Sequence, residues 1–501
     1  MKILLVYPKY PITYWGFQYA LKFVSKKASF PPLGLLSVAA LLPDHYEKKL
    51  VDMNVSALKD KDILWADYVF ISAMVIQKES AKEIIKRCQD LNVKTVAGGP
   101  LFTSEPEEFE DVNHLVLNEG ELTIPDFVRD LDSGTAVHLY TSEKWADLDK
   151  TPVPLWNLID QKAYATMNLQ YSRGCPYNCE FCNITALYGH NQRTKSSSQI
   201  RAELEALYNS GWRGAVFFVD DNFIGNKRKL KEQILPTIIQ WMTENEHPFA
   251  FLTEASINLA DDDELMQMMV KAGFDTVFIG IETPNENSLV ECNKSQNKNR
   301  DLITCVKKIQ RSGMQVLGGF IVGFDNDDIS IFDRQINFIQ QSGVVAAMVG
   351  LLNAPKGTKL YQRLAGEGRL LEGFSGNNTD FTMNFVPKMD LEVLQKGYNR
   401  IVDTIYSPKE YYERILIFLK EYNPAKSAAI PLDFSQIRAF LISIIRLGII
   451  GKERSYFWGI IFWSLFKRPK VFSLAVTLSI YGFHFRKVFH GNHAKTIEEP
   501  T

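Results

Sequence analysis

The chain has 501 residues, of which 46% are hydrophobic and 23% are charged, as in an ordinary globular protein. This composition excludes a disordered chain, a collagen-like repeat and a polytopic membrane protein, and six cysteines in 501 residues exclude a disulfide-stapled secreted scaffold. The formal net charge of −2 argues against nucleic acid as a partner.

The N-terminus begins with an apolar run, Ile3–Val6, that is too short for the core of a signal peptide. We interpret it as the first strand of a folded domain and expect a cytoplasmic protein. Val- and Ile-rich strands alternate with helices here, which predicts a parallel sheet covered on both faces. We therefore predict a doubly wound α/β domain over residues 1–150, with its ligand at the carboxyl ends of the strands. The predicted strands are Lys2–Tyr7, Lys48–Met53, Tyr68–Ala73, Lys94–Ala97 and His114–Leu117, and the helices are Leu33–Leu42, Lys78–Leu91 and Leu122–Leu131.

A proline-interrupted linker, Thr151–Trp156, precedes a second series of alternating strands and helices. Because the series is too long for a small open sheet, we expect a partial or full (β/α) barrel over residues 151–385, with its chemistry on the loops after the strands. Residues 386–501 are expected to form a mostly helical extension. The predicted strands are Leu169–Ser172, Val216–Asp220, Ala250–Thr253, Thr276–Gly280, Val316–Val322 and Ala346–Leu352, and the helices are Ser198–Asn209, Lys227–Glu244, Asp261–Lys271, Arg300–Arg311 and Ile329–Gln341.

Three of the six cysteines, Cys175, Cys179 and Cys182, fall within eight positions just after the first barrel strand. Three thiolates at this spacing can hold an iron–sulfur cubane and leave one iron open to a small molecule. The alternative is a structural zinc site with His190 as the fourth ligand. The remaining cysteines stand singly and are interpreted as small buried hydrophobes: Cys88, Cys292 and Cys305.

This Cys-x3-Cys-x2-Cys loop, with Phe181 before the last cysteine, resembles the signature of the radical S-adenosylmethionine superfamily. With a doubly wound domain in front, the chain resembles the cobalamin-dependent radical S-adenosylmethionine enzymes, and among them the branch of the hopanoid methylases, which carry a similar C-terminal extension. The resemblance implies that Cys175, Cys179 and Cys182 ligate a [4Fe–4S] cluster whose open iron binds S-adenosylmethionine. It also implies a radical that removes hydrogen from an unactivated carbon, cobalamin as the methyl carrier, and an electron donor such as flavodoxin or ferredoxin.

Acidic residues at the ends of the predicted barrel strands are candidates for binding S-adenosylmethionine. In the superfamily the end of the second strand contacts the methionyl ammonium, and here it carries Asp220, Asp221 and Asn222. A helix N-cap is the open alternative for this segment. Glu254 and Glu282 each end a strand and are candidates for the ribose hydroxyls or the amino group.

Glycines on the fifth barrel strand give a further resemblance. Gly319, Ile321 and Gly323 match a Gly-x-Ile-x-Gly pattern that lies beside the adenine in the superfamily. Phe181 of the cysteine loop joins the same set of S-adenosylmethionine contacts by resemblance. Close packing of another group against the strand is the alternative reason for its glycines.

The first domain departs from the family at one position. Many cobalamin domains carry an Asp-x-His motif whose imidazole ligates cobalt, and the matching stretch here is Asp52-Met53-Asn54. An amide is a poor cobalt ligand, so we predict cobalamin bound without a histidine ligand. The other candidates lie at strand ends, where glycine allows close approach to a nucleotide tail and an ordinary tight turn is the alternative. They are Ser72, Met74, Gly98, Gly99, Ser104 and Glu119.

Two N-terminal segments are assigned to the space between the domains. Phe30–Leu36 is predicted to form an interdomain roof. The aromatic residues of Tyr7–Phe23 are expected either to line a hydrophobic substrate cavity or to pack in the core, and they are Tyr10, Tyr14, Trp15, Phe17 and Tyr19.

The C-terminal tail is basic and apolar, with ten Lys or Arg and four Asp or Glu from Pro431 onward. Its apolar runs are Ser455–Phe466 and Val471–Phe485, and the longer has 15 residues. As a helix it would measure about 22 Å, less than the ~30 Å hydrocarbon core of a bilayer. Tryptophans beside basic clusters are typical of the membrane interface. We therefore expect peripheral contact with the inner face of the cytoplasmic membrane; a helical hairpin packed on the protein or on another subunit is the alternative.

The leading hypothesis from these residues and the resemblance is an enzyme that methylates an unactivated carbon of an apolar, lipid-like substrate. A second hypothesis is a radical enzyme that uses cobalamin for a cyclisation or rearrangement. A third is a non-catalytic metal-binding protein.

Overall fold

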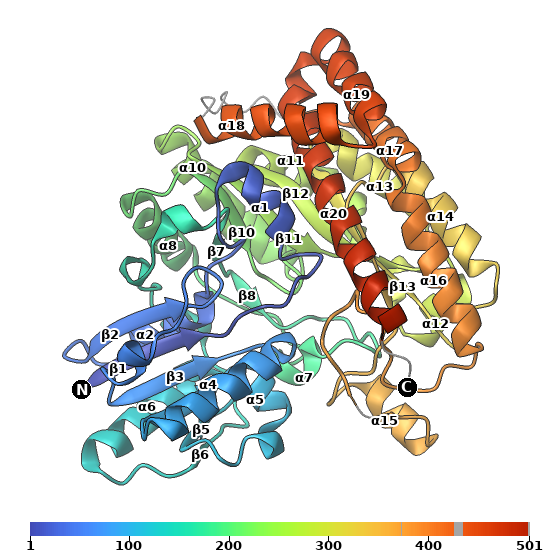
Figure 1. Cartoon of the computed structure of the whole chain (residues 1–501). Helices are drawn as coiled ribbons and strands as arrows, with labels where there is room; N and C mark the ends of the chain where they lie inside the picture. Colours follow the sequence, from blue (N-terminus) through green and yellow to red (C-terminus); the bar gives the residue numbers. More distant parts are fainter. Residues whose placement is uncertain (372, 425–433, 499–501) are drawn as a thin grey trace.

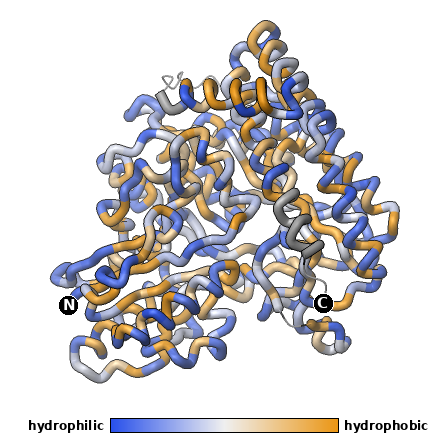
Figure 2. Tube along the Cα trace, viewed as in Figure 1, coloured by the Kyte–Doolittle hydropathy of each residue, from blue (hydrophilic) through white to orange (hydrophobic). Residues whose placement is uncertain are grey.

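The computed structural model describes residues 1–371, 373–424 and 434–498. Within these ranges the chain forms two six-stranded parallel sheets, a two-stranded sheet and a helical C-terminal part (Figure 1). Hydrophobic residues follow the strands of both large sheets and the C-terminal helices (Figure 2). The expected fold class, a doubly wound domain followed by a partial barrel and a helical extension, is confirmed.

The first sheet has the strand order β2-β1-β3-β4-β5-β6 and is parallel throughout. Side chains alternate across it: Leu4 and Val6 pack toward one set of helices, and Ile3 and Leu5 toward the other. The longer helices on the first face are α4 (Lys78–Asp90) and α5 (Pro100–Ser104), with Ile63 of a short helix beside them, and those on the second are α2 (Leu33–Leu41) and α6 (Gly120–Ser133). The strands are β1 (Lys2–Tyr7), β2 (Glu47–Asp52), β3 (Tyr68–Ser72), β4 (Lys94–Gly98), β5 (His114–Val116) and the unpredicted edge strand β6 (Leu139–Tyr140).

The second sheet has the order β14-β13-β12-β11-β10-β7, with β7 and β14 at its two edges, so it is a partial barrel. The first predicted strand is displaced: Ser172 leaves the sheet and pairs with Thr194 in the small antiparallel sheet of β8 (Ser172–Arg173) and β9 (Arg193–Thr194). The cause is Asp220, whose buried carboxylate accepts hydrogen bonds from the Ser172 backbone and hydroxyl. The sheet strands are β7 (Met167–Leu169), β10 (Gly214–Phe218), β11 (Phe249–Ala255), β12 (Phe274–Glu282), β13 (Gln315–Val322) and β14 (Ala347–Leu351).

Helices connect the strands of this sheet close to their predicted positions. The segment predicted as one helix over Lys227–Glu244 is continuous but contains a π-helical turn, η6 (Leu230–Ile234), between α9 (Lys227–Lys229) and α10 (Leu235–Glu244). The other long helices are α8 (Ser197–Asn209), α11 (Asp263–Ala272), α13 (Leu302–Ser312) and α14 (Ile331–Ser342). The shorter helices in this part of the chain are α7 (Ile184–Tyr188), α12 (Glu286–Glu291) and α15 (Lys359–Gly366). Two further short helices, α1 (Gln18–Val24) and α3 (Asp60–Ile63), come between strands of the first sheet.

The C-terminal helices cover α14 and the N-terminal segment (Figure 1). Tyr14 stacks on Phe485 of α20 with ring centroids 4.1 Å apart, and the His484 ring donates to the Tyr14 carbonyl at 2.9 Å. Burial lowers the pKa of His484 to about 4, which keeps the ring neutral. These elements are α16 (Leu391–Tyr406), α17 (Pro408–Glu421), α18 (Phe434–Ser443), the π-helical η9 (Ile444–Ile450), α19 (Arg454–Lys467) and α20 (Phe472–Glu498).

The two apolar runs of the tail have different environments. Most large side chains of Val471–Phe485 are buried against the protein, so this run follows the packed alternative and not the membrane interpretation. Ser455–Phe466 packs one side inward and exposes Phe462 and Phe466 on the other. Among the residues described, no helix combines the length and the hydropathy that a membrane crossing requires.

A buried hydrogen bond joins the two sheets. The Tyr164 hydroxyl, just before β7, donates to the Asp52 carboxylate at the end of β2 over 2.9 Å. Asn54 donates to the same carboxylate from its backbone and its side chain, each at 2.8 Å. Burial raises the pKa of Asp52 despite these three donors. This contact fixes the edge of the first sheet against the start of the second.

We expect Tyr164→Phe to lower the free energy of unfolding by about 1–2 kcal/mol, because the variant removes one donor from a buried carboxylate. Thermal unfolding of the purified chain measures this. Tyr19→Phe is the matched control, since the Tyr19 hydroxyl makes no hydrogen bond to a described residue. Equal melting temperatures for Tyr164→Phe and wild type would contradict the role of this bond.

Candidate active site

A continuous cavity of about 1720 Å³ lies between the two sheets and reaches the C-terminal helices. Its walls come from the strand ends of the first sheet, the inner side of the second sheet, the N-terminal segment 7–38, and helices α18 and α20. Pockets for one small ligand are typically ~300–1,000 Å³. The cavity therefore has room for more than one ligand at once.

Most of the cobalamin candidates line the first-sheet wall of this cavity. Asp52 does not, because it lies beneath Tyr164. Ser104, in α5, does not line the cavity either. Its neighbour Thr103 makes the hydrogen bond in this region, accepting from the Asn118 backbone at 3.0 Å. The candidates on the wall are Asn54, Ser72, Met74, Gly98, Gly99 and Glu119.

The two glycines are required by close packing. Gly99 has φ +91°, and a side chain there would place Cβ 2.5 Å from the Ser72 hydroxyl. A Cβ on Gly98 would collide with the Val116 carbonyl oxygen of β5. Close packing is thus enough to explain why both positions are glycine. Because both glycines also lie on the cavity wall, contact with the nucleotide tail of cobalamin stays a proposal.

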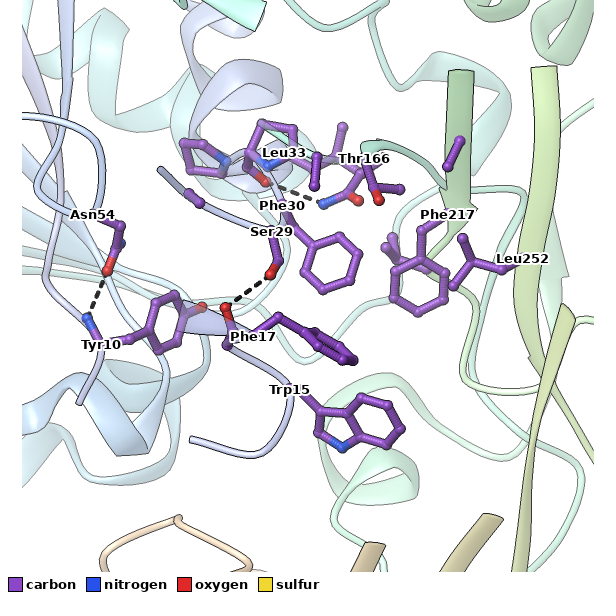
Figure 3. A pocket seen from close by; sticks show the side chains of 18 of the residues that line it. Tyr10, Trp15, Phe17, Ser29, Phe30, Leu33, Asn54, Thr166, Phe217 and Leu252 are labelled. Atoms are coloured by element: carbon purple, nitrogen blue, oxygen red, sulfur yellow. Dashed lines mark hydrogen bonds between the residues drawn. The ribbon is translucent and has the colours of Figure 1, made fainter. Parts of the chain in front are cut away.

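The side chain of Asn54 is engaged within the protein (Figure 3). Its carbonyl accepts from the Tyr10 backbone at 2.8 Å, and its amide donates to Asp52 at 2.8 Å and to the Pro8 carbonyl at 3.2 Å. These bonds brace the N-terminal segment against β2. An amide held in this way suits a cobalamin site in which the Asp-x-Asn stretch supplies no cobalt ligand.

A cluster of charges joins the first sheet to the cysteine loop. The Arg173 guanidinium contacts Glu119 at 3.0 Å and Glu121 at 2.8 Å, and Arg193 contacts Glu119 at 2.8 Å. Burial alone would raise the pKa of Glu121, but Arg173 outweighs it and holds the pKa at about 2. Sequence reasoning missed Arg173, although this residue stands two positions before the first cysteine.

The three cysteines lie in a loop that the β8–β9 hairpin closes. Gly174 opens this loop with φ +88°, and a Cβ there would be 2.9 Å from the carbonyl oxygens of Gly189 and Asn191. Asp220 anchors the chain just before it, accepting from the Tyr171 backbone at 3.1 Å. Burial raises the pKa of Asp220 to about 7. Asp220 therefore lies under the loop and does not line the cavity.

The surroundings of the cysteines suit a cluster of several irons. Among the described residues, no three His, Cys, Asp or Glu side chains converge as they would around one metal ion, and His190 is exposed. A cubane spreads three thiolates over three iron corners, whereas structural zinc needs four converging ligands. The Gln296 amide lies 3.7 Å from the Cys179 sulfur and the Asn222 amide 4.0 Å from that of Cys175. This donor set fits an iron–sulfur cluster better than zinc.

A buried cation stands beside this loop. The Lys294 ammonium pairs with Glu282 at 2.5 Å and lies 5.9 Å from the centre of the Phe181 ring. Burial lowers its pKa, but Glu282 and then Cys179 raise it more, so Lys294 stays charged. Its positive charge favours anionic sulfur nearby. No motif in the sequence pointed to Lys294.

Two of the carboxylates predicted to bind S-adenosylmethionine, Asp221 and Glu254, face the cavity. Asp221 accepts from the Gly174 backbone at 3.1 Å, and the side chain of Glu254 makes no hydrogen bond to a described residue. Burial raises the pKa of Asp221 to about 6, and burial with repulsion from Asp221 raises that of Glu254 to about 8. Adjacent carboxylates with unmet hydrogen-bonding capacity favour a cationic ligand group such as an ammonium.

The remaining S-adenosylmethionine candidates lie outside the cavity lining. Asn222 accepts from the Ser256 backbone at 3.2 Å, and the rings of Phe181 and Phe324 lie 6.3 Å apart. A Cβ on Gly319 would be 2.8 Å from the Phe278 ring, which itself lines the cavity. Those that support the walls and the cysteine loop from behind are Phe181, Asp220, Asn222, Glu282, Gly319, Ile321 and Gly323.

The part of the cavity away from the cysteines is apolar and aromatic (Figure 3). Trp15 donates to the Met348 sulfur at 2.9 Å and meets the Phe278 ring edge-on with centroids 5.5 Å apart. The rings of Phe30 and Phe217 pack against each other at a tilt, with centroids 5.5 Å apart. Four of the five aromatic residues named in the prediction line the cavity, and one of them, Tyr14, is also packed in the core; the four are Tyr10, Tyr14, Trp15 and Phe17.

The structure combines a parallel sheet that has a cavity at its strand ends with a partial barrel that carries a three-cysteine loop. This combination is typical of enzymes that bind one cofactor on the sheet and an iron–sulfur cluster on the barrel. Comparison with known families agrees. Residues 24–128 match the B12 binding domain, residues 169–339 match the radical SAM superfamily, and residues 358–498 match a domain of unknown function, DUF4070.

Individual relatives give the same assignment. The chain is 40% identical over 490 residues to an uncharacterised methyltransferase of Synechocystis, covering 97% of this chain and 91% of that protein. It is 36% identical over 388 residues to the hopanoid C-2 methylase of Rhodopseudomonas palustris, covering 76% and 73%. The chain therefore belongs to the cobalamin-dependent radical S-adenosylmethionine enzymes. The expected cofactors, an iron–sulfur cluster, S-adenosylmethionine and cobalamin, are those of this family.

Solved structures share the fold at low sequence identity. The cobalamin-dependent S-adenosylmethionine radical enzyme OxsB, with aqua-cobalamin bound, aligns with a TM-score of 0.63 at 15% identity, covering 100% of this chain and 82% of that one. The radical S-adenosylmethionine methyltransferase TsrM of Kitasatospora setae, with cobalamin and a [4Fe–4S] cluster bound, aligns with a TM-score of 0.59 at 13% identity, covering 99% and 100%.

We expect Cys175→Ser, Cys179→Ser and Cys182→Ser each to lose most of the bound iron and the visible absorbance of the cluster, because a hydroxyl is a poor iron ligand compared with a thiolate. Iron and sulfide analysis after anaerobic reconstitution measures this. Cys305→Ser is the matched control, since Cys305 lies on α13 away from the loop. Wild-type iron content in any one of the three variants would contradict the assignment of that cysteine.

We expect the unliganded protein to lose stability as the pH rises from about 4.3, the usual value for Glu, to about 8, the pKa of Glu254. The pKa is raised in the folded state, so folding favours the protonated carboxyl, and ionising it costs stability over this window. Thermal unfolding across the pH range, compared with Glu254→Gln, isolates the effect. The difference in stability between variant and wild type should grow in favour of the variant toward high pH; a difference independent of pH would contradict it.

Proposed function

We propose that this enzyme transfers a methyl group to an unactivated carbon of an apolar, lipid-like substrate held in the cavity. The observation that carries the proposal is the continuity of one cavity from the first-sheet strand ends, past Asp221 and Glu254, to an aromatic end formed by Trp15 and Phe278. The polar part of the cavity, at Asp221 and Glu254, suits S-adenosylmethionine, and the aromatic end suits an apolar substrate. The relatives named as methyltransferases, one of them a hopanoid methylase, support this reaction.

In this proposal residues 1–150 hold cobalamin, residues 151–385 hold the cluster and S-adenosylmethionine, and residues 386–501 close the substrate end. When bound, the cofactors supply the radical and the methyl group. Cys175, Cys179 and Cys182 hold the cluster. The backbone at Gly98 and Gly99, with Ser72, Met74, Asn54 and Glu119 nearby, lines the place for cobalamin.

The chain's own charges orient S-adenosylmethionine. Asp221 and Glu254 face the cavity and would pair with its ammonium, which removes the repulsion between the two carboxylates. Gly319, Ile321 and Gly323, with Phe181 and Glu282, shape the neighbouring wall from behind. Asp52, Asp220 and Asn222 hold the backbone segments that carry these groups, and Ser104 takes no part in the proposed site.

The apolar end of the cavity accounts for the proposed substrate class. Rings from three separate elements, Trp15, Phe217 and Phe278, converge there, and burying an apolar ligand against them displaces water from both surfaces. Exclusion of water also protects a carbon radical from side reactions. An electron donor such as flavodoxin or ferredoxin would reduce the cluster, and the enzyme would act in the cytoplasm, in peripheral contact with the membrane.

The test is anaerobic turnover of the full chain reconstituted with iron, sulfide and hydroxocobalamin, with S-adenosylmethionine, a reductant and a bacterial lipid extract. We expect 5′-deoxyadenosine and S-adenosylhomocysteine in equal amounts by mass spectrometry, and label from the S-adenosylmethionine methyl group in a lipid product. Trp15→Ala should lower product formation about tenfold or more through the lost apolar contact, with little effect on cluster content.

Other product patterns point to the other two hypotheses. 5′-Deoxyadenosine without S-adenosylhomocysteine, in the presence of a changed lipid, indicates cyclisation or rearrangement. Absence of both products from protein that carries a full cluster and binds S-adenosylmethionine overturns the enzymatic proposal and leaves a metal-binding role.

A further inference from the structure

The outer face of α18 and η9 is apolar. Ile437, Leu441, Ile445 and Ile449 repeat every four residues and are all exposed, and Ile450 beside them is 73% exposed. Side chains at this spacing lie on one side of a helix. On a helix that faces water, this side would carry polar residues.

The next helix, α19, continues the apolar surface. Trp458, Phe462 and Phe466 are again spaced by four and stack in sequence, with ring centroids 5.3 and 6.4 Å apart. Phe466 is 76% exposed, and the exposed Leu465 lies next to it. The Trp458 ring donates to the Gly448 carbonyl at 3.0 Å, which ties α19 to η9. Together α18, η9 and α19 form what we call the apolar ridge, at the opposite end of the molecule from the first sheet (Figure 1).

Positive charge surrounds the apolar ridge. Residues 436–489 contain nine Lys or Arg and one acidic residue, Glu453. Glu453 is buried and paired with Arg486 at 2.6 Å, so it offers no negative charge to the surface. Exposed cations without an ion pair to a described residue flank the ridge; they are Arg438, Lys452, Arg454, Lys467 and Lys470.

The apolar ridge is continuous with the cavity. Gln436, Ile437, Ala439 and Phe440 of α18 line the cavity, as do residues along the N-terminal half of α20. Ile437 is therefore both exposed on the ridge and part of the cavity wall. The helix α18 therefore lies between the cavity and the exposed side chains of the apolar ridge.

We propose that the apolar ridge is a docking surface for an anionic lipid bilayer, and that a lipid substrate passes from the bilayer into the cavity beside Ile437. Helices that lie in the plane of a membrane bury apolar side chains at the acyl boundary and place Lys and Arg among anionic headgroups. A second copy of this chain would cover the same apolar side chains but would bring two sets of unpaired cations together. The passage of substrate rests on the lipid substrate of the proposed function. The docking surface assigns the proposed membrane contact to particular residues and does not depend on which reaction the enzyme catalyses.

The experiment is co-sedimentation of the full chain with vesicles of equal parts phosphatidylglycerol and phosphatidylcholine, and with vesicles of phosphatidylcholine alone. We expect binding to the anionic vesicles that weakens as salt is added, since salt screens the cations. The double variants Leu441→Ser/Ile445→Ser and Phe462→Ser/Phe466→Ser should each lower the partition coefficient about tenfold or more, because each removes two large apolar side chains from the contact. None of these four residues lines the cavity.

Ile329→Ser is the matched control, because Ile329 is equally exposed but lies before α14 on the barrel; it should bind vesicles as wild type does. Binding of either double variant at the wild-type level, or no binding of wild type to anionic vesicles, overturns the proposal. So does a dimer in light scattering that the same double variants convert to monomer, which would assign the apolar ridge to a second copy of the chain.

Turnover separates this inference from the proposed function. In detergent solution the double variants should cleave S-adenosylmethionine at the wild-type rate, and should lose product formation only when the lipid is presented in vesicles. Vesicle binding that depends on the apolar ridge, together with no methylation of any lipid, supports the docking surface and overturns the proposed substrate.

Discussion

The position of the cysteine loop relative to the first sheet depends on one buried group of charges. Arg173 stands directly before the glycine that opens the loop, and its guanidinium reaches Glu119 and Glu121 at the start of α6. Because all three side chains are largely withdrawn from water, each would be costly to leave unpaired. Arg193 closes the group from the other strand of the β8–β9 hairpin. The strand ends of the first sheet and the cysteine loop are therefore held at a fixed distance from each other, and the cavity is the space between them.

The cost of leaving a buried charge unpaired also explains why several acidic residues near the site are bound to other groups of the protein. Asp52 joins the sheets through Tyr164, Asp220 binds the backbone before the loop, and Glu282 neutralises Lys294. These carboxylates fix the walls, while Asp221 and Glu254 remain directed into the cavity. A buried carboxylate whose oxygens already accept hydrogen bonds from the protein has few acceptor positions free for a ligand. Hydrogen bonding therefore separates the carboxylates that hold the walls from those that are directed into the cavity.

The C-terminal helices give the cavity its second end. α20 is buried against Tyr14 and the N-terminal segment, and α18 lies across the opening with one side on the cavity and the other outward. Ala439 and Phe440 of α18 line the cavity, while Leu441 and Ile445 are exposed on the apolar ridge.

The sequence by itself determined the order of strands and helices, the parallel sheets, and the cysteine loop with its cofactor class. The strands, the helices and the cysteine loop follow from local periodicity and residue spacing, which act over a few positions. The cofactor class follows from the resemblance of the loop and the first domain to a known family. It also placed Ser72, Gly98, Gly99 and Glu254 at strand ends, where the cavity lies. Only the tertiary structure decided that Asp220 and Glu282 turn away from the cavity, that Arg173 and Lys294 belong to the site, and that Val471–Phe485 is buried while Phe462 and Phe466 are not. The physical reason is that burial and ion pairing join residues far apart in the chain, and an amino-acid pattern shows which side chains are apolar or charged without showing what they will meet.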